Sequence, residues 1–262
     1  MIQVISRVDR VLGSFTRERP ELTLTECAGA AELTKSSVHR LLLSLEQVGL
    51  VERKRDTALW RLGPRVVWLA SVRLGQFELR REAVSRLREL GQTFRAAAAF
   101  SVPEGSDMVY LERQESPEPF SASARLGGRA SIWAGGSGRA VLSRLTEEER
   151  TARLDVEEWH RLPGQTRAAV MQEVEEAAKR GYAVDPGTFF EGVAGVAVPV
   201  SDLHGHPVAA LSLIVSPERL RQTGVEAMGE RLIAAAAELE ALLGAPPKDG
   251  FAPAVTNGGD SA

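Results

Sequence analysis

Small hydroxyl and cationic side chains gather at the start of a predicted helix that follows Thr34 and ends at Gly49. Thr34 is a favourable N-cap residue and Gly49 a favourable terminator. Serine and threonine hydroxyls reach phosphates and base edges, and arginine can bind guanine through two hydrogen bonds. A helix N-terminus also carries partial positive charge that attracts phosphate. The pattern favours a helix that reads the DNA major groove through Thr34, Lys35, Ser36, Ser37, His39 and Arg40, although His39 fits a solvent-facing position equally well.

The second half of this segment is aliphatic, and its spacing predicts one buried face formed by Val38, Leu41, Leu42, Leu45 and Val48. Two earlier segments can receive that face. Residues 2–16 carry an apolar stripe at helical spacing, made of Val4, Ile5, Val8, Val11, Leu12 and Phe15. Residues 26–32 predict a short helix capped by Thr23 or Thr25, and Thr23 with Glu26 matches a capping box. The three helices predict a helix-turn-helix head, in which we also assign Thr25 to the DNA-binding set.

A basic hairpin is predicted directly after the third helix. "LVERK" and "LWRL" alternate like strands, and "RDTA" forms the turn between them. A solvated charge run on an ordinary hairpin would show the same pattern, but the position after such a helix favours the wing of a winged helix-turn-helix. Residues 1–76 hold 12 basic and 8 acidic residues, net +4, against −7 for the remainder, which suggests that only this part meets a polyanion. The predicted phosphate contacts of the wing are Arg53, Lys54 and Arg55.

The length of 262 residues suggests two domains. We expect the winged head over residues 1–62 and a linker helix over 63–78, since Pro64 suits a first helical turn. The apolar surface of this helix is too wide for an exposed connector, so we expect it to pack against a second subunit. Residues 79–244 then form a second domain. Residues 245–262 lack periodicity and are predicted to be disordered.

The second domain mixes both periodicities. Strands are predicted over 96–102, 107–114, 120–127, 181–185, 192–202 and 207–216, with helices between and after them. Antiparallel strands with helices packed to one side predict an α+β sensor-like domain.

The segment "AGGSGRA" (134–140) raises three chemical possibilities. Arg139 stands where a nucleophile elbow needs glycine, and the Gly-Lys-Ser/Thr end of a phosphate-binding P-loop is missing. An anion cradle remains, because a helix that starts with small residues presents its N–H groups to a carboxylate. Close packing of helix on sheet needs small residues too, so cradle and packing both stay open.

Other reactive side chains are scattered. Ser212, a hydroxyl in an aliphatic strand, either bonds to backbone or faces a pocket. For Arg113 we favour an ion pair with nearby acids over a position leaning across the cavity. His204 and His206 show no third metal ligand, so we expect a solvated turn and no metal, and we place His160 on the surface. With no Ser/His/Asp set and no paired carboxylates in view, we expect neither an enzyme nor a cofactor.

Composition limits the cellular setting. Cys27 is the only cysteine, which excludes an internal disulfide, and its small apolar neighbours favour a buried structural thiol. Arg7, Asp9 and Arg10 interrupt any signal-peptide core, and no apolar run approaches the ~18 residues that span a bilayer. We expect a soluble, cytoplasmic protein with no membrane partner.

The order of these parts resembles the IclR family of bacterial transcriptional regulators. "LTLTECAGAAELTKSSVHRLLLSLEQVGLVERKRDTALWRLGPRVVWL" is similar to the family's DNA-binding domain. "LGGRASIWAGGSGRAVLS" and "RGYAVDPGTFFEGVAGVAVPVSD" are similar to segments of its effector domain. The matching residues of the first part are Leu24, Thr25, Glu26, Leu33, Lys35, Ser36, Ser37, Arg40, Leu41, Leu42, Leu45, Gly49, Leu50, Val51, Trp60, Leu62 and Gly63.

The resemblance implies a winged helix-turn-helix, a linker helix and a GAF-like α/β sensor domain. It also implies an effector site that includes Leu126, Trp133, Ala134, Gly135, Gly136, Asp185, Val193, Gly195 and Ser212. Asp185 fits the role of a turn or capping residue at least as well. The chain departs from the family pattern at 131–136, at Arg139, at Thr188 and at Gly195, where the family more often has Pro-Leu-His with Thr-Ala, Lys, Glu and Cys. The glycines should widen the pocket, and Trp133 should narrow it elsewhere.

Together these patterns predict a ligand-responsive regulator of a catabolic or metabolic operon, a repressor rather than an activator. Its expected partners are double-stranded operator DNA, a small organic acid or related metabolite, and a second copy of the chain, as a homodimer or dimer of dimers. Two alternatives remain open. The N-terminal module of a metabolite-binding or catalytic protein could serve assembly only, or the effector pocket could be vestigial.

Overall fold

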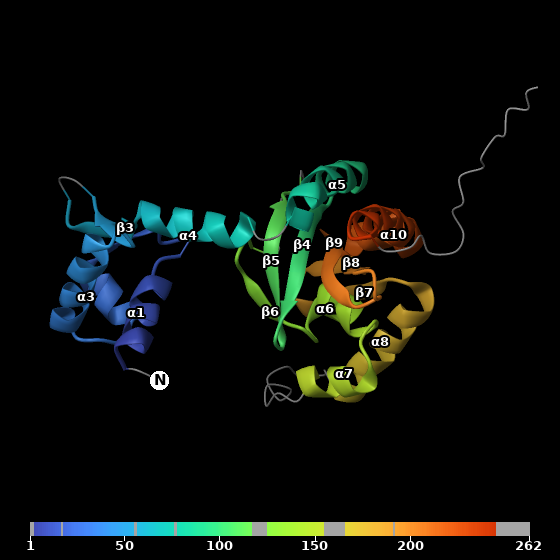
Figure 1. Cartoon of the computed structure of the whole chain (residues 1–262), viewed down its shortest axis with the longest axis horizontal. Helices are drawn as coiled ribbons and strands as arrows, with labels where there is room; N and C mark the ends of the chain where they lie inside the picture. The colour runs from blue at the N-terminus through green and yellow to red at the C-terminus, as the bar shows by residue number, and fades with distance from the viewer. Residues whose placement is uncertain are drawn as a thin grey trace, which may run out of the picture. The chain divides into compact units, whose positions relative to one another are not determined.

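The computed structural model describes residues 3–16, 18–54, 57–75, 78–116, 125–154, 166–190 and 192–244. The chain divides into two compact units, Met1–Phe77 and Glu78–Ala262, whose helices and strands are drawn in Figure 1. Each unit has its own buried core. Our predictions for Arg55, His160 and the tail at 245–262 fall outside the described residues. No helix within the described ranges combines the length and the apolar character needed to span a bilayer.

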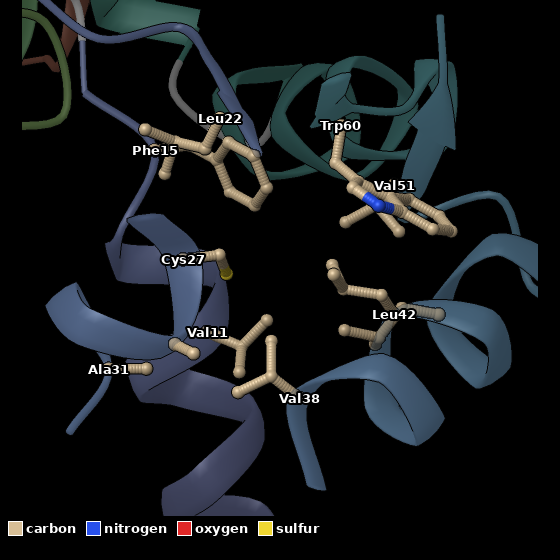
Figure 2. Close-up of a cluster of buried hydrophobic side chains, with 11 residues drawn as sticks. Val11, Phe15, Leu22, Cys27, Ala31, Val38, Leu42, Val51 and Trp60 are labelled. Atoms are coloured by element: carbon tan, nitrogen blue, oxygen red, sulfur yellow. The ribbon is translucent and has the colours of Figure 1, made fainter. Parts of the chain in front are cut away.

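The N-terminal unit contains helices and a small antiparallel sheet with strand order β1-β3-β2. Its core joins three of its helices to the sheet: Figure 2 shows Val11 beside Val38, Phe15 beside Leu22, and Trp60 beside Val51. The elements are α1 (Gln3–Gly13), β1 (Glu21–Thr23), α2 (Leu24–Ala30), α3 (Lys35–Gln47), β2 (Val51–Arg53), β3 (Leu59–Leu62) and α4 (Pro64–Gly75).

Local hydrogen bonds explain where α2 and α3 begin. Thr23, rather than Thr25, caps α2, and its side chain and that of Glu26 form the predicted capping box. Thr34 caps α3 by accepting a hydrogen bond from the backbone N–H of Ser37. Gly49 follows α3 with a φ of 76°, a left-handed conformation that glycine adopts at low cost. The predicted caps of both helices are confirmed.

Three predicted core residues are exposed instead. Val4 and Ile5 lie on the surface of α1, and Val48 lies on the surface at the end of α3. The helical stripe was correct for Val11, which is fully buried, but the apolar side chains in the first turn of α1 are exposed. Cys27 is buried as predicted, and burial raises the pKa of its thiol.

The helix α4 presents a broad apolar surface. Val67 is 71% exposed and Trp68 60% exposed, and Leu69 and Val72 are exposed beside them. Large apolar side chains are rarely exposed together in this way on the surface of a monomeric soluble protein.

The C-terminal unit is built on a six-stranded antiparallel sheet with order β6-β5-β4-β9-β8-β7. The two central strands are joined through partners such as Ala99 and Ser212. Its elements are α5 (Glu78–Phe94), β4 (Ala97–Glu104), β5 (Asp107–Gln114), β6 (Arg129–Ser131), α6 (Gly135–Leu142), α7 (Glu147–Leu154), α8 (Arg167–Arg180), β7 (Ala183–Phe190), β8 (Val193–Ser201), β9 (Pro207–Val215), α9 (Pro217–Thr223) and α10 (Val225–Leu242).

Helices cover both faces of this sheet, so the prediction of helices on one side is wrong. The helices α5 and α10 pack together on one face, and α6 with α8 covers the other (Figure 1). A Cβ on Gly91 of α5 would lie 3.9 Å from the Cβ of Ala98, whereas one on Gly136 of α6 would lie 3.4 Å from that of Ala197. Because successive strand residues point to opposite faces, long runs of β8 and β9 are buried on both sides.

The predicted strand at 120–127 is wrong in its described part. Arg125–Gly127 form a turn, and the edge strand β6 lies later, at Arg129–Ser131. Residues 120–124 fall outside the described residues.

Candidate DNA-binding surface and effector cavity

The polar first turn of α3 lies on the surface of the N-terminal unit. Hydrogen bonds hold its hydroxyl groups together: Thr34 Oγ1 donates to Ser37 Oγ at 2.9 Å and lies 3.3 Å from Ser36 Oγ. The buried leucines behind them hold the helix to the core. Ser37 is half-buried, and the other predicted contacts, Thr25, Thr34, Lys35, Ser36, His39 and Arg40, are exposed.

The described part of the hairpin is basic but partly neutralised. Lys54 Nζ lies 2.9 Å from Glu21 Oε2, and Arg61 Nη2 lies 2.6 Å from Glu52 Oε1. Arg53 is exposed, and its backbone N–H donates to Glu46 at the end of α3. Exposed ion pairs contribute little to stability, so Lys54 can leave Glu21 for a phosphate at small cost.

A small cavity of about 40 Å³ lies between the start of α6 and the strands β7, β8 and β9 of the C-terminal unit. Seven of the nine residues predicted for the effector site line it: Ala134, Gly135, Gly136, Asp185, Val193, Gly195 and Ser212. Leu126 and Trp133 do not. Leu126 is exposed, and Trp133 is buried in a core cluster with Ile132 and Leu142 and is not among the lining residues, so it does not narrow the cavity as we predicted.

The cavity contains polar groups among small apolar walls. Tyr110, on β5, shares a hydrogen bond with Ser137 of α6. Burial has the largest effect on the pKa of Tyr110 and raises it, and the negative charge of Asp185 raises it further. The hydrogen bond with Ser137 and the positive charge of Arg113 lower this pKa and so oppose the rise. Ser212 is 4% exposed, and its Oγ makes no hydrogen bond to any described residue. A buried hydroxyl left without a partner indicates a place for a hydrogen-bonding ligand.

The start of α6 packs closely against neighbouring backbone and also lines the cavity. A Cβ on Gly138 would lie 1.7 Å from the carbonyl oxygen of Ile132, so this glycine permits a close approach of backbone to backbone. Gly135 instead faces the cavity, where a Cβ on this residue would lie 3.6 Å from Asp185 Oδ2. The N-cap residue Ala134 supplies no side-chain hydrogen bond to the helix. The first turn of α6 therefore presents donors to the cavity beside an acid.

An ion pair between a buried arginine and a partly exposed glutamate connects α6 to α8. Arg139 is fully buried, pairs with Glu173 and donates from Nε to the carbonyl oxygen of Trp133 at 3.4 Å. Burial raises the pKa of Glu173, and the Arg139 charge opposes that rise. Breaking such a pair would leave a buried charge uncompensated, so Arg139 positions the segment that leads into α6.

The contacts of Arg113 and of the two histidines can be compared with what the sequence predicted for them. Arg113 forms the favoured ion pair, with Nη2 2.9 Å from Glu115 Oε2. His204 and His206 lie in an exposed turn whose backbone N–H groups donate to Asp202 Oδ1. Across the described ranges, no three His, Cys, Asp or Glu side chains lie close enough to hold a metal ion.

Sequence reasoning missed several cavity residues. Tyr110 and Ser137 carry its hydrogen bonds, and Ile214 carries an apolar wall. The alternation along β9 could have identified Ile214, two residues after Ser212, since both must point to one face. The remaining unforeseen lining residues are Ala194, Val196, Ala197 and Leu213.

Family models match most of the chain. The IclR helix-turn-helix domain matches residues 4–55, and the bacterial transcriptional regulator IclR C-terminal domain matches residues 72–241. The first match contains α3, and the second contains the cavity.

Whole-length relatives agree with these matches. The HTH-type transcriptional regulator XynR of Escherichia coli K12 is 28% identical over 94% of this chain and 99% of its own length. The acetate operon repressor of Salmonella typhimurium is 28% identical over 91% of this chain and 89% of its own. The structure of an IclR homolog from Microbacterium hydrocarbonoxydans complexed with 4-hydroxybenzoate superposes with a TM-score of 0.78, at 30% identity over 92% of this chain and 99% of the other. This chain therefore belongs to the IclR family of bacterial transcriptional regulators, which are ligand-responsive DNA-binding proteins.

Proposed function

We propose that this protein represses a catabolic or metabolic operon and that a small organic acid controls its hold on operator DNA. The observation that carries the proposal is the exposed row of hydroxyl and cationic groups on α3, anchored by a buried three-helix core. A related chain named as the acetate operon repressor supports repression rather than activation.

In this proposal residues 1–62 bind DNA. Ser36, Ser37 and Arg40 contact the major groove, and Thr25, Thr34, Lys35 and His39 lie beside them. The wing, with Arg53, Lys54 and Arg55, holds adjacent phosphates. Each cation placed on a phosphate releases counterions, so the binding weakens as salt rises.

Residues 79–244 bind the effector at the cavity. The hydroxyl of Ser212, which has no hydrogen-bond partner among the described residues, and the first turn of α6 supply hydrogen bonds to it, and Asp185 faces the same space. The relative bound to 4-hydroxybenzoate supports an acid as the ligand. Binding of this kind needs no catalytic group, and we propose that the chain regulates rather than catalyses.

The segment 63–78 links effector to DNA through a dimer or a dimer of dimers. The uncovered apolar side chains of α4 support packing against a second copy. Two DNA-reading heads must reach half-sites about 34 Å apart, or a multiple of that distance, so a small change in their separation alters affinity.

A binding experiment tests this proposal. The full-length chain is titrated against the intergenic DNA beside its own gene, with mixed-sequence DNA as competitor and with increasing salt. We expect tight binding that resists the competitor, weakens with salt, and shifts when a binding acid from a thermal-shift panel of aromatic and aliphatic acids is added. Equal affinity for both DNAs would favour the alternative in which the N-terminal module serves assembly only. DNA binding that no acid alters would favour a vestigial pocket.

A further inference from the structure

The side chain of Arg113 lies on the cavity face of the sheet. Its neighbour Glu112 points the other way, toward α5, where its Oε2 lies 2.6 Å from Arg80 Nη2. Gln114 also faces α5, since a Cβ on Gly91 would lie 3.2 Å from its Cγ. Successive residues of a strand point to opposite faces, so Arg113 faces α6 and the cavity.

A β-bulge brings Arg113 and Tyr110 to the same face. Tyr110 pairs with Ser101 and Arg113 pairs with Ala99, while the register shifts between Phe100 and Ser101. Residues three apart on a regular strand would point in opposite directions, and the one extra residue of the bulge removes that difference. The charge of Arg113 reaches Tyr110, which lines the cavity.

The direct cross-strand row between Arg113 and the cavity residue Ser212 contains one small side chain, that of Ala99. Direct cross-strand partners form one row across the sheet, from Arg113 through Ala99 and Ser212 to Ala197. Neighbouring strands are about 4.8 Å apart, so Arg113 and Ser212 are roughly 10 Å apart at their Cα atoms. Only the methyl group of Ala99 stands between them in this row. A long arginine side chain can cross such a row.

The charges of the site favour a nearby cation for an acid ligand. Asp185 is a buried carboxylate in the cavity wall, and none of the described lining residues is Lys, Arg or His. An acid that enters the cavity meets this negative charge in a weakly screened environment. Arg113 is the cation whose influence already extends to the lining residue Tyr110.

We propose that Arg113 is the specificity-determining residue that selects acids over neutral ligands at this site, with Glu115 occupying the guanidinium until a ligand carboxylate replaces it. This inference rests on the proposed function, in which the effector is an organic acid. The Arg113 side chain is 11% exposed, whereas Glu115 is 67% exposed. An exposed partner is easily displaced, and the guanidinium has five N–H donors arranged to bind a carboxylate through two of them.

The test compares acids with their amides on the full-length chain. Titration calorimetry measures benzoate, 4-hydroxybenzoate, lactate and pyruvate against benzamide, 4-hydroxybenzamide, lactamide and pyruvamide. We expect the preference of the wild-type protein for the best acid over its amide to fall by about tenfold or more in Arg113→Gln, since a charged hydrogen bond is lost. Arg113→Lys should keep part of the preference, and Glu115→Gln should raise acid affinity.

A second readout needs no ligand. In protein carrying ¹³C-labelled tyrosine, NMR titration follows Tyr110 and Tyr182 separately. Burial, Asp185 and Ser137 also act on Tyr110, but only the Arg113 charge is removed in Arg113→Gln, so the Tyr110 pKa should rise. An acid preference that survives in Arg113→Gln, with Tyr110 titrating as in the wild type, overturns the role of Arg113 and leaves the proposed function standing. A wild-type protein that binds no acid better than its amide overturns the organic-acid proposal, and the role of Arg113 falls with it.

Discussion

The ring of Tyr182 lies directly on Gly229: a Cβ added to this glycine would come within 2.5 Å of Tyr182 Cδ1. Tyr182 precedes β7 and Gly229 belongs to α10, so the contact joins a sheet edge to the last helix that the structure describes. The guanidinium of Arg180 lies 5.1 Å from the centre of the same ring. The ring therefore contacts both the guanidinium of Arg180 and the backbone of α10. The Arg-Gly-Tyr segment has a structural role at this edge of the sheet.

Replacing Gly229 with alanine should destabilise the C-terminal unit by about 1–3 kcal/mol, because the new methyl group overpacks the ring. Urea unfolding of the full-length chain measures the change. Gly29→Ala is the matched control, since its Cβ meets nothing within 4 Å and its helix should tolerate alanine. Combining Gly229→Ala with Tyr182→Leu should recover part of the lost stability. If Gly229→Ala reduces the stability equally with tyrosine or with leucine at position 182, the contact is contradicted.

Arg40→Ala should reduce discrimination between operator and mixed-sequence DNA by about 1–3 kcal/mol, because a two-hydrogen-bond contact to a base is lost. Gel-shift titration on both DNAs measures this difference. Arg10→Ala, on α1, removes the same charge from an exposed position and should weaken binding to both DNAs alike, if at all. If the two variants behave identically, Arg40 does not read sequence.

Local chemistry explains what could be predicted in the N-terminal unit. The hydroxyls of Thr23 and Thr34 cap helices through bonds within three residues, and the spacing of Val38 and Leu42 depends only on the helical period. The strand β1 was missed because its three residues extend only through pairing with β3, as Leu22 does with Trp60. A contact between distant segments leaves no periodic pattern in so short a stretch.

At the cavity, too, some residues could be predicted from the sequence and others could not. Asp185 and Ser212 were assigned to the site by family resemblance, and both line the cavity. Tyr110 was missed because the bulge between Phe100 and Ser101 decides which residues of β5 share a face, and no residue type marks that bulge. Trp133 was misplaced because its position in the motif does not show that its side chain joins the core beside the site rather than the cavity.

The capping box of α2 predicts a pH dependence. Hydrogen bonds from the Thr23 backbone and side chain lower the pKa of Glu26 below its usual 4.5. A carboxyl whose pKa is lower in the folded state contributes stability above its unfolded pKa and loses it as pH falls through the folded value. Wild type should therefore exceed Glu26→Gln in stability at neutral pH, and the gap should close below pH 4.5. Chemical denaturation at a series of pH values measures the gap, and a gap that is constant with pH would contradict the assignment.

Ser212→Ala separates a binding hydroxyl from a structural one. The Ser212 Oγ is buried and makes no hydrogen bond to any described residue, so its removal should leave the stability of the ligand-free protein unchanged or raise it by about 1 kcal/mol. Ser143→Ala is the contrasting variant, because Ser143 Oγ donates to the carbonyl oxygen of Ala140 at 2.7 Å and its loss should destabilise. Affinity for the acids that bind should fall several-fold in Ser212→Ala and not in Ser143→Ala, since only the first hydroxyl lines the cavity. Denaturant unfolding and calorimetry on the same three proteins give both quantities. A Ser212→Ala protein that is less stable than the wild type, and that binds acids equally well, would show that this hydroxyl serves the fold.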